Sequence, residues 1–329
     1  MYRGNACRWL AIGCLLAAVA SVGGLAGDTP ARRTPPSNMD DEQLNQLLRL
    51  HHTETEQVRL VLLPTSVTDK KGRIVRGLDR TDFHVFENQV LQEIKFFAAE
   101  ASEPISLAFL LDVSGSMRQV GKLNHAKEAI RFFVDQLHVE DQFGLICFAD
   151  EQVDWVTDFT RNRERFLQRL SVQRGWGQTA LHDAVAAAPS LVDEKIQGRR
   201  ALILITDGVD NLSQLTVEQA LDIAAHVNVP IYTIGFLPVP ESHLPKGTVE
   251  TNLEILTRVS SETGGKLYAV YGVTELKEAI TDLNNELRYQ YLIGYYPSRG
   301  SLDGAYREIE LRTSKNRHRV RTRSGYYAE

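Results

Sequence analysis

The sequence has little cysteine and no long apolar run beyond its first residues. Of its 3 cysteines, Cys7 and Cys14 fall within residues 1–26, which leaves Cys147 alone in the rest of the chain. One cysteine cannot form an internal disulfide, so the folded part must rely on its apolar core. Because Cys147 lies in the apolar segment 143–149, we expect an inert core residue and not a nucleophile.

Signatures of common enzymes are also missing. The sequence has no G-x-S-x-G nucleophile elbow, no H-E-x-x-H helix and no glycine-rich phosphate-binding loop. Lysine and arginine number 37 against 42 aspartates and glutamates, a net charge of −5, which does not favour nucleic acid as a partner. These absences favour a non-enzymatic protein.

Residues 1–26 have the composition of a secretory signal peptide. Arg3 and Arg8 precede WLAIGCLLAAVASVGGLAG, which carries no charge before Asp28, and small residues offer cleavage after AVA or GLA. The alternative is an uncleaved membrane anchor, because the run approaches the length that spans a bilayer. We expect an exported protein, periplasmic, on the cell surface or secreted, followed by a charged, proline-containing linker at 27–55.

Residues 104–286 alternate apolar strands with amphipathic helices. The segment 105–112 (ISLAFLLD) is continuously apolar, as expected of a strand covered on both faces of a parallel sheet. In the segment that follows, Leu123, Ile130 and Phe133 share one helical stripe. Repetition of this pattern predicts an α/β fold with a doubly wound, mostly parallel, Rossmann-like sheet.

Strand-like segments flank this α/β region on both sides. Residues 56–103 contain VRLVLLPTSVTD, a turn at DKKG, and FHVFENQVLQEIKFF, which we interpret as two strands about the break ENQ. Residues 287–329 return to β patterning, and 305–313 alternates apolar and charged side chains. Neither part can build a core alone. We therefore predict a small antiparallel β-sandwich of N- and C-terminal strands, into which the α/β domain is inserted.

Oxygen-bearing side chains follow two predicted strands and precede one predicted helix: Asp112, Ser114 and Ser116 in DVSGSM, Thr179 in GWGQTALHDAV and Asp207 in ITDGVDN. Ligands bind beyond the carboxyl ends of strands in open α/β sheets, so we expect these side chains to lie together. Neutral hydroxyls with two carboxylates suit Mg²⁺ or Mn²⁺, whereas a Ca²⁺ cage would enlist more carboxylates. Two aspartates only neutralise a divalent ion, which stays electrophilic toward an incoming carboxylate.

This pattern resembles a known site. D-x-S-x-S, a distant Thr and a later Asp in TDG are similar to the metal-ion-dependent adhesion site of von Willebrand factor A-type (VWA) domains, over about residues 104–285. The resemblance implies direct ligands in Asp112, Ser114 and Ser116, and direct or water-mediated ligands in Thr179 and Asp207. It further implies a protein partner that supplies an Asp or Glu carboxylate. The flanking β segments resemble bacterial VWFA-related proteins that carry this domain between β segments.

Neighbours of these residues allow structural interpretations. We expect Asp210 and Asn211 to be turn residues, Asp183 to support the start of its helix, and His182 to pack beneath or rim the site, since nitrogen ligands suit softer metals. Two tryptophans fit either packing or a rim that contacts a partner: Trp155 and Trp176. Four arginines at period two fit either an anion-binding face or pairing with acids such as Glu308 and Glu310: Arg317, Arg319, Arg321 and Arg323.

Three functions are open at this point. The leading hypothesis is an exported, non-enzymatic module that uses Mg²⁺ to bind an acidic residue of a protein partner. A second is an envelope structural or assembly factor that binds through the β-sandwich. A third is a metal-dependent hydrolase, for which the nearby base candidates are His182 and Asp210.

Overall fold

The computed structural model describes residues 60–99, 104–195, 199–237, 250–298, 302–315 and 317–328. The predicted signal segment 1–26 and the linker 27–55 lie outside these ranges, and the domain boundaries drawn from the sequence stay predictions. Residues Glu56–Glu329 form one compact unit. None of the helices within the described ranges combines the length and apolarity needed to span a bilayer.

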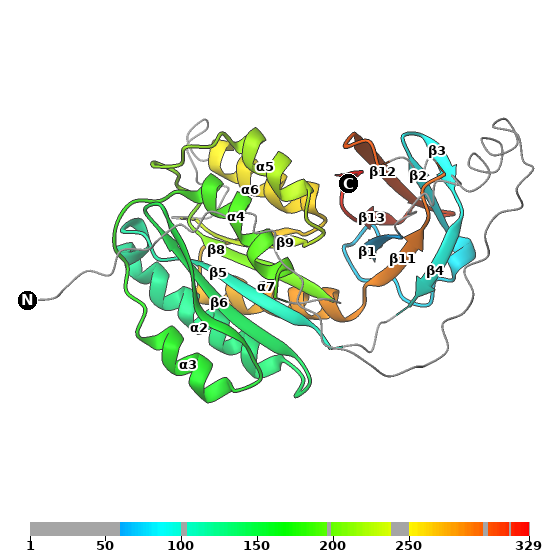
Figure 1. Cartoon of the computed structure of the whole chain (residues 1–329). Helices are drawn as coiled ribbons and strands as arrows, with labels where there is room; N and C mark the ends of the chain where they lie inside the picture. The colour runs from blue at the N-terminus through cyan, green and yellow to red at the C-terminus, as the bar shows by residue number, and fades with distance from the viewer. Residues whose placement is uncertain are drawn as a thin grey trace, which may run out of the picture. The chain divides into compact units, whose positions relative to one another are not determined.

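A six-stranded sheet in the order β10-β9-β8-β5-β6-β7 forms the centre of the α/β region (Figure 1). Its strands are β5 (Ser106–Asp112), β6 (Gln142–Ala149), β7 (Gln152–Thr160), β8 (Arg200–Thr206), β9 (Ile231–Phe236) and β10 (Leu267–Val270). All neighbours pair in parallel except the edge strand β7. Every residue of the central strand β5 is buried. The α/β, doubly wound and mostly parallel sheet is therefore confirmed.

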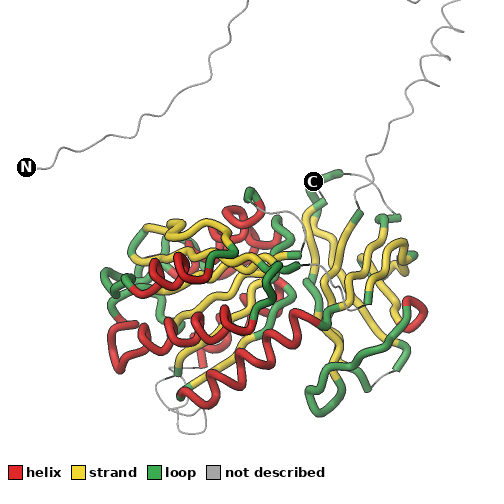
Figure 2. Tube along the Cα trace, turned by 90° about the horizontal axis from the view of Figure 1, so that it is seen from below, coloured by secondary structure: helices red, strands yellow, loops and turns green. Residues whose placement is uncertain are grey.

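Helices cover both faces of this sheet (Figure 2). One layer consists of α2 (Lys122–Gln136), α3 (Arg163–Ser171) and α7 (Val273–Arg288), and the other of α4 (Leu181–Asp193), α5 (Val217–Ala225) and α6 (Glu250–Thr263). Alternate residues of a strand point to opposite faces, so Phe109 and Leu111 join the first core and Ala108 and Leu110 the second. The apolar run in β5 thus serves two cores.

Two four-stranded antiparallel sheets form the β-sandwich, in the orders β13-β1-β11-β4 and β14-β12-β2-β3. The N-terminal strands are β1 (Val61–Thr68), β2 (Phe83–Glu87), β3 (Val90–Gln92) and β4 (Ile94–Ala98), and the C-terminal ones β11 (Tyr291–Tyr295), β12 (Tyr306–Thr313), β13 (Arg319–Arg321) and β14 (Gly325–Tyr327). Strands from both ends of the chain pair within each sheet. Their buried side chains, among them Leu63, Val85 and Ile293, form a third core. The predicted sandwich is therefore confirmed.

One detail of the N-terminal β segment differs from the prediction. Residues 83–98 form three strands and not two, because a second break at Glu93 separates β3 from β4. The expected break is a tight turn in which Asn88 and Gln89 adopt positive φ angles of 46° and 65°. After Glu93 the chain leaves the sheet of β2 and pairs with β11 in the other sheet.

Cys147 lies within β6, and only 8% of it is exposed. Burial raises the pKa of its thiol to about 12, so the reactive thiolate is not populated at neutral pH. The prediction of an inert core cysteine is confirmed.

The C-terminal arginines do not form a continuous free face. Arg321 pairs with Glu286 of α7, and Arg323 is buried, donating to the carbonyl of Gly325 at 2.6 Å. The acidic partner of Arg321 is therefore not a cross-strand glutamate. Glu310 instead pairs with Arg312 of its own strand. Two of the four arginines thus hold the fold together, which removes the basis for an anion-binding stripe.

Candidate metal centre

The first carboxylate of the site is held inside the protein. Asp112 ends β5 and is fully buried. Its Oδ1 accepts the amide of Ser114 at 2.8 Å, and its Oδ2 accepts the hydroxyl of Thr206 at 2.7 Å. Burial raises the pKa of Asp112 to about 6, and the nearby charge of Asp207 acts in the same direction. The raised pKa means that no nearby cation among the described residues compensates the negative charge of this buried carboxylate, and a bound metal ion would do so.

Three further oxygens form a chain beside Asp112. The hydroxyls of Ser114 and Ser116 lie 3.0 Å apart, and the Ser116 hydroxyl lies 3.3 Å from Oδ1 of Asp207. Adjacent ligands of an octahedral Mg²⁺ with bonds of 2.0–2.1 Å lie about 3 Å apart. The spacing of these oxygens therefore fits a small divalent cation.

An ammonium group also belongs to this cluster, and the sequence analysis missed it. Nζ of Lys122 lies 2.8 Å from Oδ2 of Asp207, with 17% of the lysine side chain and 2% of the aspartate side chain exposed. Lys122 is the first residue of α2, where the helix dipole disfavours a cation. A lysine at an unfavourable helix start, six residues after Ser116, could have indicated in the sequence that an anion lies nearby.

Thr179 lies on a loop that is bonded to the Asp112–Ser116 loop. The amide of Gly115 donates to the carbonyl of Gly177 at 3.0 Å, and the amide of Trp176 to the carbonyl of Val113 at 2.8 Å. The amide of Thr179 donates to Oδ1 of Asn211 at 2.8 Å. Among the described residues, the Thr179 side chain makes no hydrogen bond to the other four predicted ligands. Direct contacts therefore join four of the five, and Thr179 is held nearby through its main chain.

A glycine is required on this second loop. Gly177 has a φ of +68°, and a Cβ atom added there would lie 2.5 Å from Oδ1 of Asp150. That same oxygen accepts the amide of Gln178 at 2.6 Å. Asp150 thus fixes the loop just before Thr179, and only a residue without a side chain leaves room for it.

The acidic residues near the site mainly anchor its loops. The carboxylate of Asp210 accepts the amides of Ser213 and His182. Asp183 lies in the first turn of α4, as expected, and its carboxylate also accepts the amides of Gln214 and Leu215 at 3.0 Å each and so holds the loop after β8. The turn role predicted for Asp210 fits these contacts.

His182 has a packing role. Its Nδ1 lies 3.1 Å from the carbonyl of Leu215, and its buried Nε2 has no hydrogen-bond partner among the described residues. The two tryptophans differ in exposure, and contact of either with a partner stays a prediction. Trp155 packs against Phe159 with ring centroids 5.3 Å apart, whereas Trp176 is 43% exposed beside the metal loop.

The donor set is unusual in its dependence on hydroxyls. Within the described ranges, no group of three or more His, Cys, Asp or Glu side chains could hold a metal ion. A cation at Asp112 and Asp207 would find neutral hydroxyls as the further protein side-chain donors, which favours a hard ion over Zn²⁺. The residues present fit Mg²⁺ or Mn²⁺.

Comparisons with known proteins concern the α/β domain. Residues 107–209 match the model of the von Willebrand factor type A domain family. An uncharacterized protein of Borreliella burgdorferi is 28% identical over 200 residues, which cover 55% of this chain and 58% of that protein. Inter-alpha-trypsin inhibitor heavy chain H2 of Mus musculus is 21% identical over 213 residues, covering 59% and 21%. The chain thus spans less than two thirds of either relative.

A solved structure of von Willebrand factor type A from Catenulispora acidiphila is also similar. The TM-score is 0.47 at 14% sequence identity, and the match covers 80% of this chain and 72% of that one.

Proposed function

Since this chain contains a von Willebrand factor type A domain, we propose that it is an exported, non-enzymatic binding protein that holds Mg²⁺ or Mn²⁺ and offers it to an Asp or Glu of a protein partner. The ligands would be the five predicted residues: Asp112, Ser114, Ser116, Thr179 and Asp207. The observation that carries the proposal is the chain of oxygens 3.0 and 3.3 Å apart next to a buried carboxylate. A bound divalent ion would supply a positive charge that attracts the partner's carboxylate.

The charge count of the site supports a role in binding. Asp112 and Asp207 together neutralise one divalent ion, and the hydroxyls of Ser114 and Ser116 add no charge. The metal would therefore keep its attraction for a further carboxylate. Hydrolysis would also need a base that faces the metal; Nδ1 of His182 contacts the carbonyl of Leu215, and its Nε2 is buried and makes no hydrogen bond to any of the proposed ligands within the described residues. We therefore propose no catalytic residue.

Affinity capture tests this function against the assembly-factor alternative. The bait is residues 27–329, presented to envelope extract and culture medium of the source organism in Mg²⁺, in EDTA, and as the Asp112→Asn variant in Mg²⁺. We expect a partner that only the wild-type bait retains, and only with metal. Partners held equally by all three baits would move the interface to the β-sandwich and leave the metal without a role in binding.

Lys122→Met should strengthen Mg²⁺ binding. The ammonium of Lys122 pairs with the buried carboxylate of Asp207, so it competes with the metal for that carboxylate and repels a second cation. We expect the Mg²⁺ dissociation constant to fall about tenfold, equivalent to ~1.4 kcal/mol, in isothermal titration calorimetry. The exposed Lys277→Met is the control for the loss of one charge. An unchanged or higher dissociation constant in Lys122→Met would show that the lysine does not compete.

A further inference from the structure

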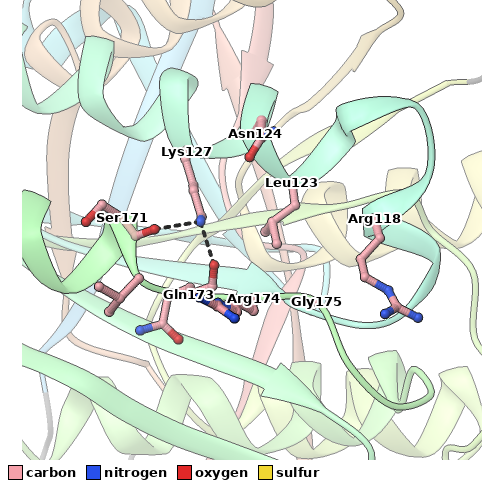
Figure 3. Close-up of a pocket in the computed structure, with 9 residues that line it drawn as sticks. Arg118, Leu123, Asn124, Lys127, Ser171, Gln173, Arg174 and Gly175 are labelled. Carbon is pink, nitrogen blue, oxygen red and sulfur yellow. Dashed lines mark hydrogen bonds between the residues drawn. The ribbon is translucent and has the colours of Figure 1, made fainter.

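A basic cavity of about 550 Å³ lies next to the metal loop (Figure 3). Three of its 9 lining residues carry a positive charge, and none is an aspartate or glutamate. The cations are Arg118 from the turn after Ser116, Lys127 from α2 and Arg174 from the loop after α3. The chain as a whole is acidic, with a net charge of −5, so this concentration of cations is a local feature.

The cavity and the metal loop share a wall. Arg118 follows the predicted ligand Ser116 by two residues. At Gly175, an added Cβ atom would lie 2.5 Å from Cγ of Arg118 and 3.0 Å from the carbonyl oxygen of Ser114. The arginine, the glycine and the metal loop are therefore in close packing, and a side chain at position 175 would displace Arg118. A short ligand segment that reaches the metal is also within reach of this cavity.

Lys127 is engaged by the protein itself, whereas Arg118 and Arg174 are available to a ligand. Nζ of Lys127 donates to the carbonyls of Ser171 and Gln173 at 2.9 and 2.5 Å (Figure 3), so this lysine caps the C-terminus of α3. Arg118 and Arg174 are exposed, and neither pairs with an acidic side chain in the part of the chain that the structure describes. Burial lowers the pKa of Lys127, and the like charge of the nearby Arg174 acts in the same direction.

We propose that this cavity receives a second carboxylate from the same partner segment whose first carboxylate reaches the metal. This inference rests on the proposed function and specifies the partner as a segment with two acidic side chains. Guanidinium groups bind carboxylates through two parallel hydrogen bonds, and Arg118 and Arg174 both line this cavity. The shared wall favours a carboxylate over a sulfated glycan, because the adjacent metal site takes the same chemical group.

The test compares a one-glutamate peptide with a series of two-glutamate peptides, each of which differs from it in one residue. One carries a single glutamate in a glycine–serine sequence, and the other carries two glutamates separated by one to four residues. Binding to the wild-type chain is measured by NMR titration in Mg²⁺ and in EDTA. The pocket variant is Arg118→Gln with Arg174→Gln, and the control is Arg165→Gln with Arg169→Gln, two exposed arginines of α3 outside the cavity. Heparin is the sulfated probe.

We expect the wild type to bind the best two-glutamate peptide about tenfold more tightly than the one-glutamate peptide, as one charge-assisted contact provides. The pocket variant should lose this difference and keep its affinity for Mg²⁺ and for the one-glutamate peptide, and the control should resemble the wild type. Equal affinities of the wild type for the two peptides, or a difference that survives in the pocket variant, would overturn the second-carboxylate site alone. So would a pocket variant that loses only heparin binding. Absence of Mg²⁺-dependent binding of either peptide would overturn the proposed function and the inference with it.

Discussion

Asp112→Asn should abolish Mg²⁺ binding and still raise the melting temperature of the metal-free protein at neutral pH. The variant loses a direct carboxylate ligand, and we expect the Mg²⁺ dissociation constant to rise more than about 100-fold, beyond what outer-shell partners of metal ligands contribute. The amide keeps the shape of the carboxylate and an oxygen for the Ser114 amide. Calorimetric titration with Mg²⁺ and thermal unfolding in EDTA measure the two effects.

The stability part of this prediction follows from the pKa of Asp112. Burial raises that pKa to about 6 in the folded chain, above the ordinary value of an aspartate. The folded state then holds the proton more tightly than the unfolded state. The favourable contribution of Asp112 is complete below about pH 4 and is lost as the pH rises through 6. Wild type and variant should therefore differ little in EDTA at pH 4.5, and the variant should melt higher at pH 8.

An exposed aspartate of α2 provides the control. Asp135→Asn removes one negative charge from the surface and should leave both the Mg²⁺ affinity and the melting temperature near those of the wild type. Tight Mg²⁺ binding by Asp112→Asn would exclude this residue as a ligand. A lower melting temperature in EDTA at pH 8 would show that the carboxylate stabilises the metal-free fold.

The strands and helices could be predicted from local patterns, because burial of one face of an element requires apolar residues at regular spacing within it. The apolar run of β5 and the stripe of α2 could each be recognised from neighbouring residues alone. The break at Glu93 could not, because no glycine or proline marks it. It arises where the chain passes from β3 in one sheet to β4 in the other, and β4 pairs there with β11, about 200 positions away.

The site likewise combines features that local sequence predicts with contacts between residues far apart in the chain. The two-residue spacing of Asp112, Ser114 and Ser116 is local, and the structure places the two hydroxyls within 3.0 Å. Lys122 could not be assigned from spacing, since its partner Asp207 is 85 positions away. The sequence likewise could not predict that Arg321 would find its acid on α7, because that contact depends on how the β-sandwich meets the α/β region.

Arg321→Met should destabilise the β-sandwich and the α/β region together. Glu286 of α7 is only 4% exposed and is held by Arg321 of β13 and by the hydroxyl of Ser66 of β1 at 3.0 Å. Removal of the arginine leaves a buried carboxylate that only neutral hydroxyls contact, those of Ser66 and Tyr232, so we expect a loss of about 3–5 kcal/mol in the free energy of unfolding. Urea denaturation followed by circular dichroism and by tryptophan fluorescence measures it.

The reason for a joint loss is that Glu286 of α7 contacts strands from both ends of the chain, β13 through the ion pair with Arg321 and β1 through the hydroxyl of Ser66. The tryptophans that report on the α/β region, Trp155 and Trp176, lie far along the chain from Arg321, yet their transition should shift with the circular dichroism signal.

Adding Glu286→Gln to the variant should recover most of the loss, because no unpaired charge then remains buried. Arg312→Met breaks an exposed pair with Glu310 and should cost no more than about 1 kcal/mol. Two separate transitions, with the tryptophan signal unmoved, would show that the sandwich unfolds independently and that Glu286 does not couple it to the α/β region.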